Sequence, residues 1–162
     1  MTDPFTMTHE ALLDVLFKHD LLAAEIRSGN RVSFLNKRHA FKEEVQAGDL
    51  PELRLVPTGG TPHIFRTSNS SSCVRRWEIQ VSTGDQRVNV KLLPIEWYVF
   101  EAMHGWEAVL AELTWCGKKF VKRCMPLTIQ SGISNADLSR NVIGWATVWG
   151  CEIEMFFSSS DL

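Results

Sequence analysis

The stretch from Leu93 to Trp115, which reads LPIEWYVFEAMHGWEAVLAELTW, constrains the fold more than any other part of the chain. Its apolar residues recur at steps of three and four, which places a continuous apolar stripe on one face of an α-helix. The residues of this series are Ile95, Tyr98, Val99, Ala102, Met103, Trp106, Val109, Leu110 and Leu113. Pro94 suits the first turn of a helix, where its missing N–H costs nothing. We therefore expect one helix over 93–115, packed across a broad, flat surface.

Two features of this helix leave alternatives open. Gly105 is unfavourable inside a helix, and it indicates either a kink or a close approach of another backbone. Trp97, Phe100 and His104 form a second flank beside the main stripe. That flank either widens the core face or makes a contact between subunits.

Segments with alternating apolar and polar residues flank the helix and predict strands. In Val74–Thr83, Trp77, Ile79 and Val81 point to one side, whereas the residues between them are polar. A long strand is expected over 142–157. Its predicted inner face consists of Trp145, Thr147, Trp149, Cys151, Ile153 and Met155. Shorter strands are expected near 53–55, between two prolines, and over 120–131.

The remaining elements are predicted from caps and turns. Thr8 is the expected cap of an N-terminal helix that ends near His19–Asp20, with a further turn over 21–26. The segment 87–92 is expected to be extended, Gly117 to cap the long helix, and 135–138 to form a helical turn. Residues 31–45 are expected to be extended and partly exposed.

Together these elements predict a single α+β domain over residues 1–162. Its two layers would be a mainly antiparallel or mixed sheet of about four strands and, on one face, the long helix with the N-terminal helix. Residues 58–72, rich in Gly, Ser, Thr and Pro, are expected to be a flexible loop or an arm that orders on a partner. Its candidate contact residues are Ile64, Phe65 and Arg66. The tail 158–162 is expected to be loose.

Composition narrows the class of protein. The chain has 162 residues, 44% of them hydrophobic, and a net charge of −2, which argues against a dedicated nucleic-acid binder. The sequence lacks a signal peptide and an apolar run long enough to span a bilayer, so no membrane association is expected. Four cysteines without CxxC spacing favour buried thiols in a reduced compartment.

Motifs that carry chemistry are missing from the sequence. There is no GxSxG, Walker or HExxH motif, and no cysteine has a neighbouring histidine. We therefore expect no catalytic, cofactor or metal site, and we do not expect the protein to be an enzyme. Lys118, Lys119, Lys122 and Arg123 form either a solvated turn or a patch for an acidic partner or DNA. Glu152 and Glu154 lie on the same face of the last strand, and this face is either exposed to solvent or lines the lumen of a ring.

The order of these elements resembles the tail-terminator and tail-completion proteins of long-tailed bacteriophages. The residues that carry the resemblance are Asp49–Pro57, Trp77–Asp85, the helix from Pro94 to Leu113 and the strand Trp145–Phe156. The resemblance implies a structural virion protein with no cofactor. Such proteins form a ring, typically hexameric, at the head-proximal end of the tail tube. The ring stops tube polymerisation and joins the tail to the head connector.

The resemblance also implies partners and location. The expected partners are other copies of the chain, the tail tube protein and the head–tail connector or adaptor, with DNA only passing through the ring. The expected location is the virion neck, and the host cytoplasm during assembly. Three alternatives stay open: another neck or head–tail adaptor protein, a small nucleic-acid-binding module, and an α+β enzyme.

Overall fold

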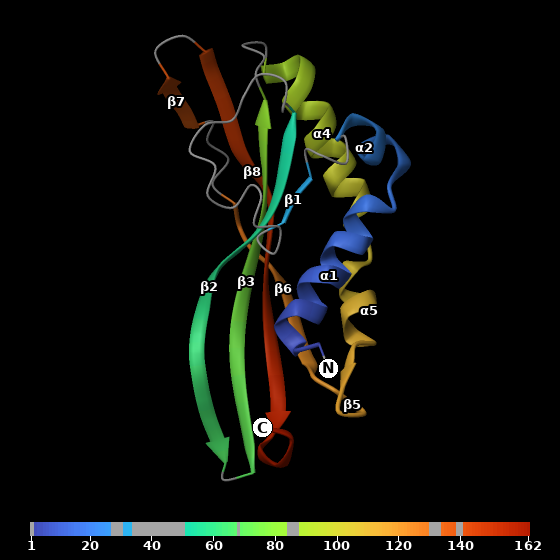
Figure 1. Ribbon diagram of the computed structural model, residues 1–162, viewed down its shortest axis with the longest axis vertical. Coiled ribbons are helices and arrows are strands. Elements are labelled where there is room, and N and C mark those ends of the chain that lie inside the picture. Colours follow the sequence, from blue (N-terminus) through green and yellow to red (C-terminus); the bar gives the residue numbers. More distant parts are fainter. Residues whose placement is uncertain are drawn as a thin grey trace.

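A sheet forms one layer of the protein and the helices form the other (Figure 1). The computed structural model describes residues 2–26, 31–33, 51–67, 69–83, 88–129, 134–138 and 141–162. The helical elements are α1 (Pro4–Phe17), α2 (Asp20–Glu25), α4 (Val88–Ala102), α5 (Trp106–Ala111) and the 3-10 turn η3 (Ser159–Asp161). The strands are β1 (Arg31–Ser33), β2 (Glu52–Thr67), β3 (Ser70–Thr83), β4 (Thr114–Trp115), β5 (Lys118–Lys119), β6 (Val121–Pro126), β7 (Ser134–Leu138) and β8 (Asn141–Ser158).

The sheet is mixed. Its strand order is β1-β2-β3-β8-β6, and β7 also pairs with β8. Strand β1 runs parallel to β2, whereas the other neighbours are antiparallel. The two-layer α+β prediction is confirmed, with six strands in the described sheet instead of about four. Residues 34–50, which contain most of the extended segment expected over 31–45, lie outside the described residues.

The core lies between the two layers. From the sheet, Trp77, Ile79 and Val81 are buried toward the helices, as their alternation predicted. The helical layer contributes a larger set of buried side chains, which includes Leu12, Leu16, Leu22, Ile95, Val99, Met103, Trp106 and Leu110. Among the described residues, no helix is both long and apolar enough to cross a membrane.

The expected single helix over 93–115 is in fact two helices. Gly105 adopts a φ of 78°, a left-handed conformation that glycine reaches without strain, and it precedes α5. The chain therefore breaks between α4 and α5, as the kink alternative anticipated. Helix α4 also begins earlier than expected, at Val88, so the prediction of an extended segment is wrong for residues 88–92. Pro94 is accommodated inside α4, where it removes one backbone hydrogen bond.

Gly117 does not cap the helix. The chain leaves α5 at Ala111 and forms the small hairpin β4–β5. Cys116 and Gly117, with φ values of 50° and 74°, make its two-residue turn. Positive φ at both central residues is typical of the type I′ turn, whose twist matches that of the flanking strands. The glycine signal was real, but it marked a hairpin instead of a helix end.

The predicted loop over 58–72 is instead part of a long β-hairpin, made by β2 and β3 (Figure 1). Its glycines explain why the sequence looked irregular. The pairing shifts register between Pro57 and Gly59, and Gly60 lies against the neighbouring strand. A Cβ on Gly60 would come within 1.9 Å of the Val74 carbonyl oxygen. Glycine here permits a bulge in a strand, as it does at many sheet irregularities.

Strand β8 also contains an irregularity. Ile79 pairs with Trp149 and Gln80 with Thr147, so Val148 is an extra residue in β8. A bulge of this kind reverses which side chains face inward on its two sides. Cys151, Ile153 and Met155 are buried in the core as predicted, but Thr147 lies on the opposite face. The assignment of Thr147 to the inner face was therefore wrong. The segment 135–138, expected to be helical, lies in β7.

Both ends of the described chain are held by specific contacts. Helix α1 is capped by Asp3, not Thr8, because the Thr6 N–H donates to Asp3 Oδ1 at 2.9 Å and Pro4 occupies the first turn. At the other end, Lys118 Nζ lies 2.9 Å from Asp161 Oδ2. The Ser159 N–H donates to the Asn69 carbonyl at 2.9 Å. The tail 158–162 is therefore attached to the hairpin and to β5, contrary to the expectation of a loose segment.

Candidate interaction surfaces

The outer surface of α4 carries an unusual run of exposed apolar side chains. Leu93, Trp97 and Phe100 are 51%, 55% and 65% exposed. Their spacing of four and three residues aligns them on one side of the helix, and the rings of Trp97 and Phe100 stack with centroids 5.4 Å apart. We call these three residues the outer stripe. Of the two alternatives for the flank of Trp97, Phe100 and His104, a wider core face is wrong because all three residues are exposed. A subunit contact stays a prediction.

Helix α4 is therefore apolar on two sides. Its inner side buries Ile95 and Val99 against the sheet, and Met103 is buried just beyond the end of the helix. The outer stripe faces away from this contact between helix and sheet, which we call the seam. Burial in the domain explains the inner residues but leaves the outer ones unexplained. Adjacent exposed aromatic residues on a folded domain typically mark an interaction site.

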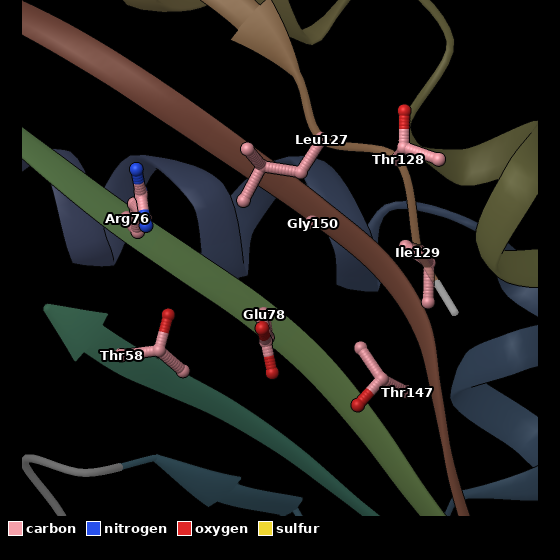
Figure 2. A pocket seen from close by; sticks show the side chains of 8 residues that line it. All are labelled: Thr58, Arg76, Glu78, Leu127, Thr128, Ile129, Thr147 and Gly150. Carbon is pink, nitrogen blue, oxygen red and sulfur yellow. The ribbon is translucent and has the colours of Figure 1, made fainter. Parts of the chain in front are cut away.

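The opposite side of the protein contains a shallow cavity of about 410 Å³ on the sheet (Figure 2). We call it the sheet trough. Strand β2 contributes Thr58, β3 contributes Arg76 and Glu78, and β8 contributes Thr147 and Gly150. The chain that leaves β6 closes one side with residues 127–129. In Figure 2 helix α1 lies behind these strands, so the trough and the helical layer are on opposite faces.

The trough has an apolar side and a charged side. Gly150 leaves its floor without a side chain, and the Leu127 N–H donates to the Gly150 carbonyl at 3.0 Å. This bond brings Leu127 over the glycine. Across the trough, Arg76 Nε lies 2.7 Å from Glu152 Oε2, which orients the guanidinium along the sheet. Glu78, two residues further along β3, lines the trough with another carboxylate (Figure 2).

The sequence did not predict the trough. Its most visible signal is Gly150 in the middle of a long strand, since such a glycine often marks a close approach of another segment. Thr147 reaches the trough only because of the extra residue Val148. Periodicity alone assigns Thr147 to the other face.

The predicted basic residues are engaged within the protein. Lys119 Nζ lies 3.0 Å from Glu112 Oε1, and Lys118 pairs with Asp161 as described above. Lys122 Nζ lies 5.2 Å from the centroid of the Phe156 ring, a cation–π contact. Arg123 is opposite Glu154 in the β6–β8 register. The carboxylates of Asp161 and Glu112 therefore offset the charge of two of these four cations.

The predicted lumen pair occupies different environments. Glu152 is partly exposed and pairs with Arg76, whereas Glu154 is only 8% exposed. Both follow the trough along β8 on the same side of the strand. Whether they face a ring lumen stays a prediction.

The predicted contact residues Ile64, Phe65 and Arg66 lie within β2. The backbones of Ile64 and Phe65 pair with Ser72 and Ser71 of β3. The structure therefore places them in the hairpin, and the side chains of 62–67 lie outside the described part.

One histidine and two cysteines in or against the core are held in their neutral forms. The Trp77 indole N–H donates to His9 Nδ1 at 3.2 Å, and burial lowers the pKa of His9 to about 4. Burial raises the pKa of the Cys124 thiol to about 11 and also raises the pKa of Cys151. Such thiols are poor nucleophiles at neutral pH. Within the described residues, no group of three or more His, Cys, Asp or Glu side chains could hold a metal ion.

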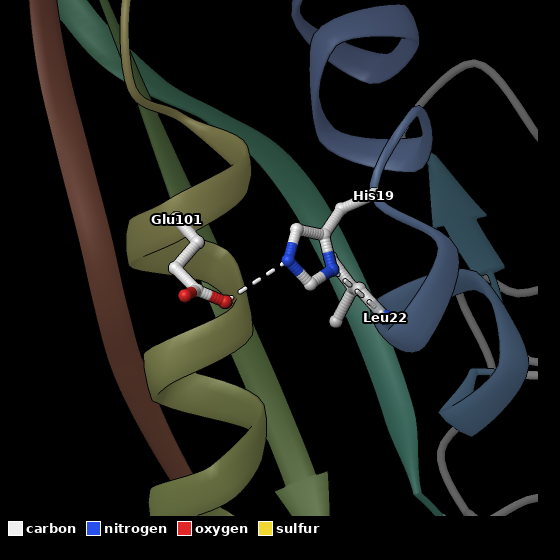
Figure 3. A network of polar contacts seen from close by, with 3 residues as sticks. All are labelled: His19, Leu22 and Glu101. Carbon is white, nitrogen blue, oxygen red and sulfur yellow. Dashed lines mark hydrogen bonds and ion pairs between the residues drawn. The ribbon is translucent and has the colours of Figure 1, made fainter.

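A polar contact also joins the helices of the outer layer (Figure 3). His19 Nδ1 accepts from the Leu22 N–H at 3.2 Å, and its Nε2 lies 3.0 Å from Glu101 Oε2. The accepting Nδ1 places the proton of a neutral ring on Nε2, which donates to the carboxylate. His19 thus caps α2 and links it to α4, so the surface that carries the outer stripe is supported by its neighbours.

Comparison with known proteins adds no relative. The chain matches no protein-family model, and no curated protein matches it either.

Proposed function

We propose that this chain is a structural virion protein, a tail terminator that forms a ring at the head-proximal end of a phage tail tube. In this role it caps tube polymerisation and joins the tail to the head connector. The observation that supports the proposal best is the outer stripe. A domain that already has a complete core has no folding reason to expose Trp97 and Phe100 side by side.

The arrangement of surfaces also favours assembly over the alternatives. The outer stripe and the sheet trough are different surfaces on opposite layers. A contact between two different surfaces is head-to-tail, and it closes into a ring when its rotation permits. By contrast, the core thiols have raised pKa values, and three of the predicted cations have intramolecular contacts. These features disfavour a thiol enzyme and a nucleic-acid module.

The proposal is tested by two measurements on the purified full chain. Negative-stain electron microscopy and light scattering should find rings, either free or on tail tubes. Addition of the protein to polymerising tail tube protein of the same virus should stop tube growth at one end. A protein that remains monomeric with tubes and leaves their length distribution unchanged would contradict the proposal. Binding to the head connector alone would indicate a head–tail adaptor.

A further inference from the structure

We infer that Trp97 of one copy inserts into the sheet trough of the next copy, and that this head-to-tail contact holds the assembly together. The inference rests on the proposed ring and names the two surfaces that build it. Its occupant is a second copy of this chain.

The dimensions of the two surfaces agree. A cavity of roughly 150 Å³ is enough for a benzene-sized ring, and the trough offers about 410 Å³. An indole therefore fits with room for part of its stacked neighbour, Phe100. The space above Gly150 is taken by Leu127, whose Cβ and Cδ1 lie 3.5 Å from the position of a Cβ on Gly150, so Leu127 forms this part of the floor.

The chemistry of the trough suits a tryptophan. Leu127 and Ile129 supply apolar contacts for the ring. The carboxylate of Glu78 can accept the indole N–H, a donor that tryptophan needs to satisfy when buried. The Arg76 guanidinium, held by Glu152, can lie against the ring face, the preferred geometry of a cation–π contact.

The two aromatic residues would supply the centre of the contact and only part of its area. Interfaces of standard size bury about 800 Å² per partner, and large aromatic residues contribute about 150–250 Å² each. Trp97 and Phe100 would be the central anchors, and Leu93 would extend the apolar surface along α4. Anchors of this type commonly dominate the energy of an interface.

The geometry requires a contact between unlike surfaces. The outer stripe lies on the helical layer, and the trough lies on the opposite face of the sheet (Figures 1 and 2). One copy can therefore offer its stripe to one neighbour and its trough to another. Such contacts propagate around a ring, whereas a contact between two stripes would stop at a dimer.

Two variants disrupt the two surfaces of the proposed contact one at a time. Trp97→Ala deletes the anchor, and Thr147→Trp fills the trough with a residue that strands favour. Leu21→Ala is the matched control, because Leu21 is 56% exposed on the helical layer but lies outside the stripe. Oligomeric state is measured by light scattering and native mass spectrometry, on free protein and on protein eluted from tail tubes after brief crosslinking. Circular dichroism verifies that each variant is folded.

The expected result is loss of the oligomer in both variants and wild-type assembly in Leu21→Ala. A mixture of Trp97→Ala and Thr147→Trp should restore one intact contact, because the first supplies the trough and the second supplies Trp97. The mixture should therefore form a heterodimer and no ring. Wild-type assembly of either variant, or a mixture that stays monomeric, would overturn the inference.

The test of the Trp97–trough contact can fail independently of the test of the terminator function. Rings that survive both substitutions would overturn the contact and leave the terminator function supported. A wild-type protein that caps tubes without self-association would overturn the contact as well. A wild-type protein that self-associates through Trp97 and the trough, but does not affect tubes, would support the contact and contradict the terminator function.

Discussion

The two sides of α4 are both apolar, but one is buried and the other is exposed. Ile95 and Val99 are buried in the seam against the sheet, whereas Leu93, Trp97 and Phe100 are more than half exposed. Both sets are apolar and follow helical spacing. The difference lies in what each set contacts: the seam residues stabilise the domain, and the stripe residues are available to a partner. Stability and assembly are therefore expected to respond to different substitutions.

Truncation of Trp106 gives the largest expected loss of stability in the seam. Trp106 is 4% exposed, and its ring meets Trp149 edge-to-face at 5.1 Å. Trp106→Ala should lower the free energy of unfolding by about 3–5 kcal/mol, because it removes this contact and leaves a cavity. Urea denaturation measures the change. A loss below about 1 kcal/mol would mean that the seam is not the source of stability.

Protonation of His9 is expected to cause the second-largest loss of stability. The pKa of His9 is about 4 in the folded state, below the ordinary value near 6.5, so the unfolded state binds the proton more readily between these values. The free energy of unfolding therefore keeps the full contribution of neutral His9 above pH 6.5 and loses it as the pH falls toward 4. The loss should be about 3 kcal/mol when the pH has fallen below 4. His9→Gln should remove this component from the pH dependence of urea unfolding; an unchanged pH profile would argue against it.

Removal of the α1 cap should have a moderate effect. Asp3→Ala deletes the acceptor for the Thr6 N–H and should cost about 1 kcal/mol, since α1 supplies Leu12 and Leu16 to the seam. Asp3→Asn is the control, because asparagine caps helices about as well. Equal melting temperatures for the two variants would contradict the role of the cap.

The smallest expected effect on stability is that of Trp97→Ala. An exposed residue outside the core should change the free energy of unfolding by at most about 0.5 kcal/mol. The same substitution should abolish the proposed self-association. Trp97→Ala and Trp106→Ala are therefore a matched pair: one tryptophan for assembly, the other for folding. If Trp97→Ala lowered the free energy of unfolding as much as Trp106→Ala, Trp97 would have to be a core residue and not an assembly residue.

The sequence predicted the layers well and the irregularities poorly. Trp77, Ile79 and Val81 alternate cleanly, so their burial was predictable. The segment around Gly59 and Gly60 was mistaken for a loop, because a bulged strand has the composition of one. Its pairing with β3 depends on residues well separated from it along the chain, and local propensity does not contain that information.

The candidate surfaces were predictable only in part. The sequence offers Trp97 and Phe100 either to the core or to a subunit contact, and their spacing does not decide between the two because both sides of α4 are apolar. The trough was missed, since it brings together four segments from separate parts of the chain (Figure 2).

The sequence by itself determined the two-layer class, the alternation of Trp77, Ile79 and Val81, and a conformational irregularity at Gly105 and at Gly117. These features depend on local sterics and on the spacing of apolar residues. Only the tertiary structure decided which side of α4 is covered and where Thr147 points. The first depends on how much of the helix the sheet can reach. The second depends on a single extra residue, Val148, whose position is set by the pairing of β8 with β3.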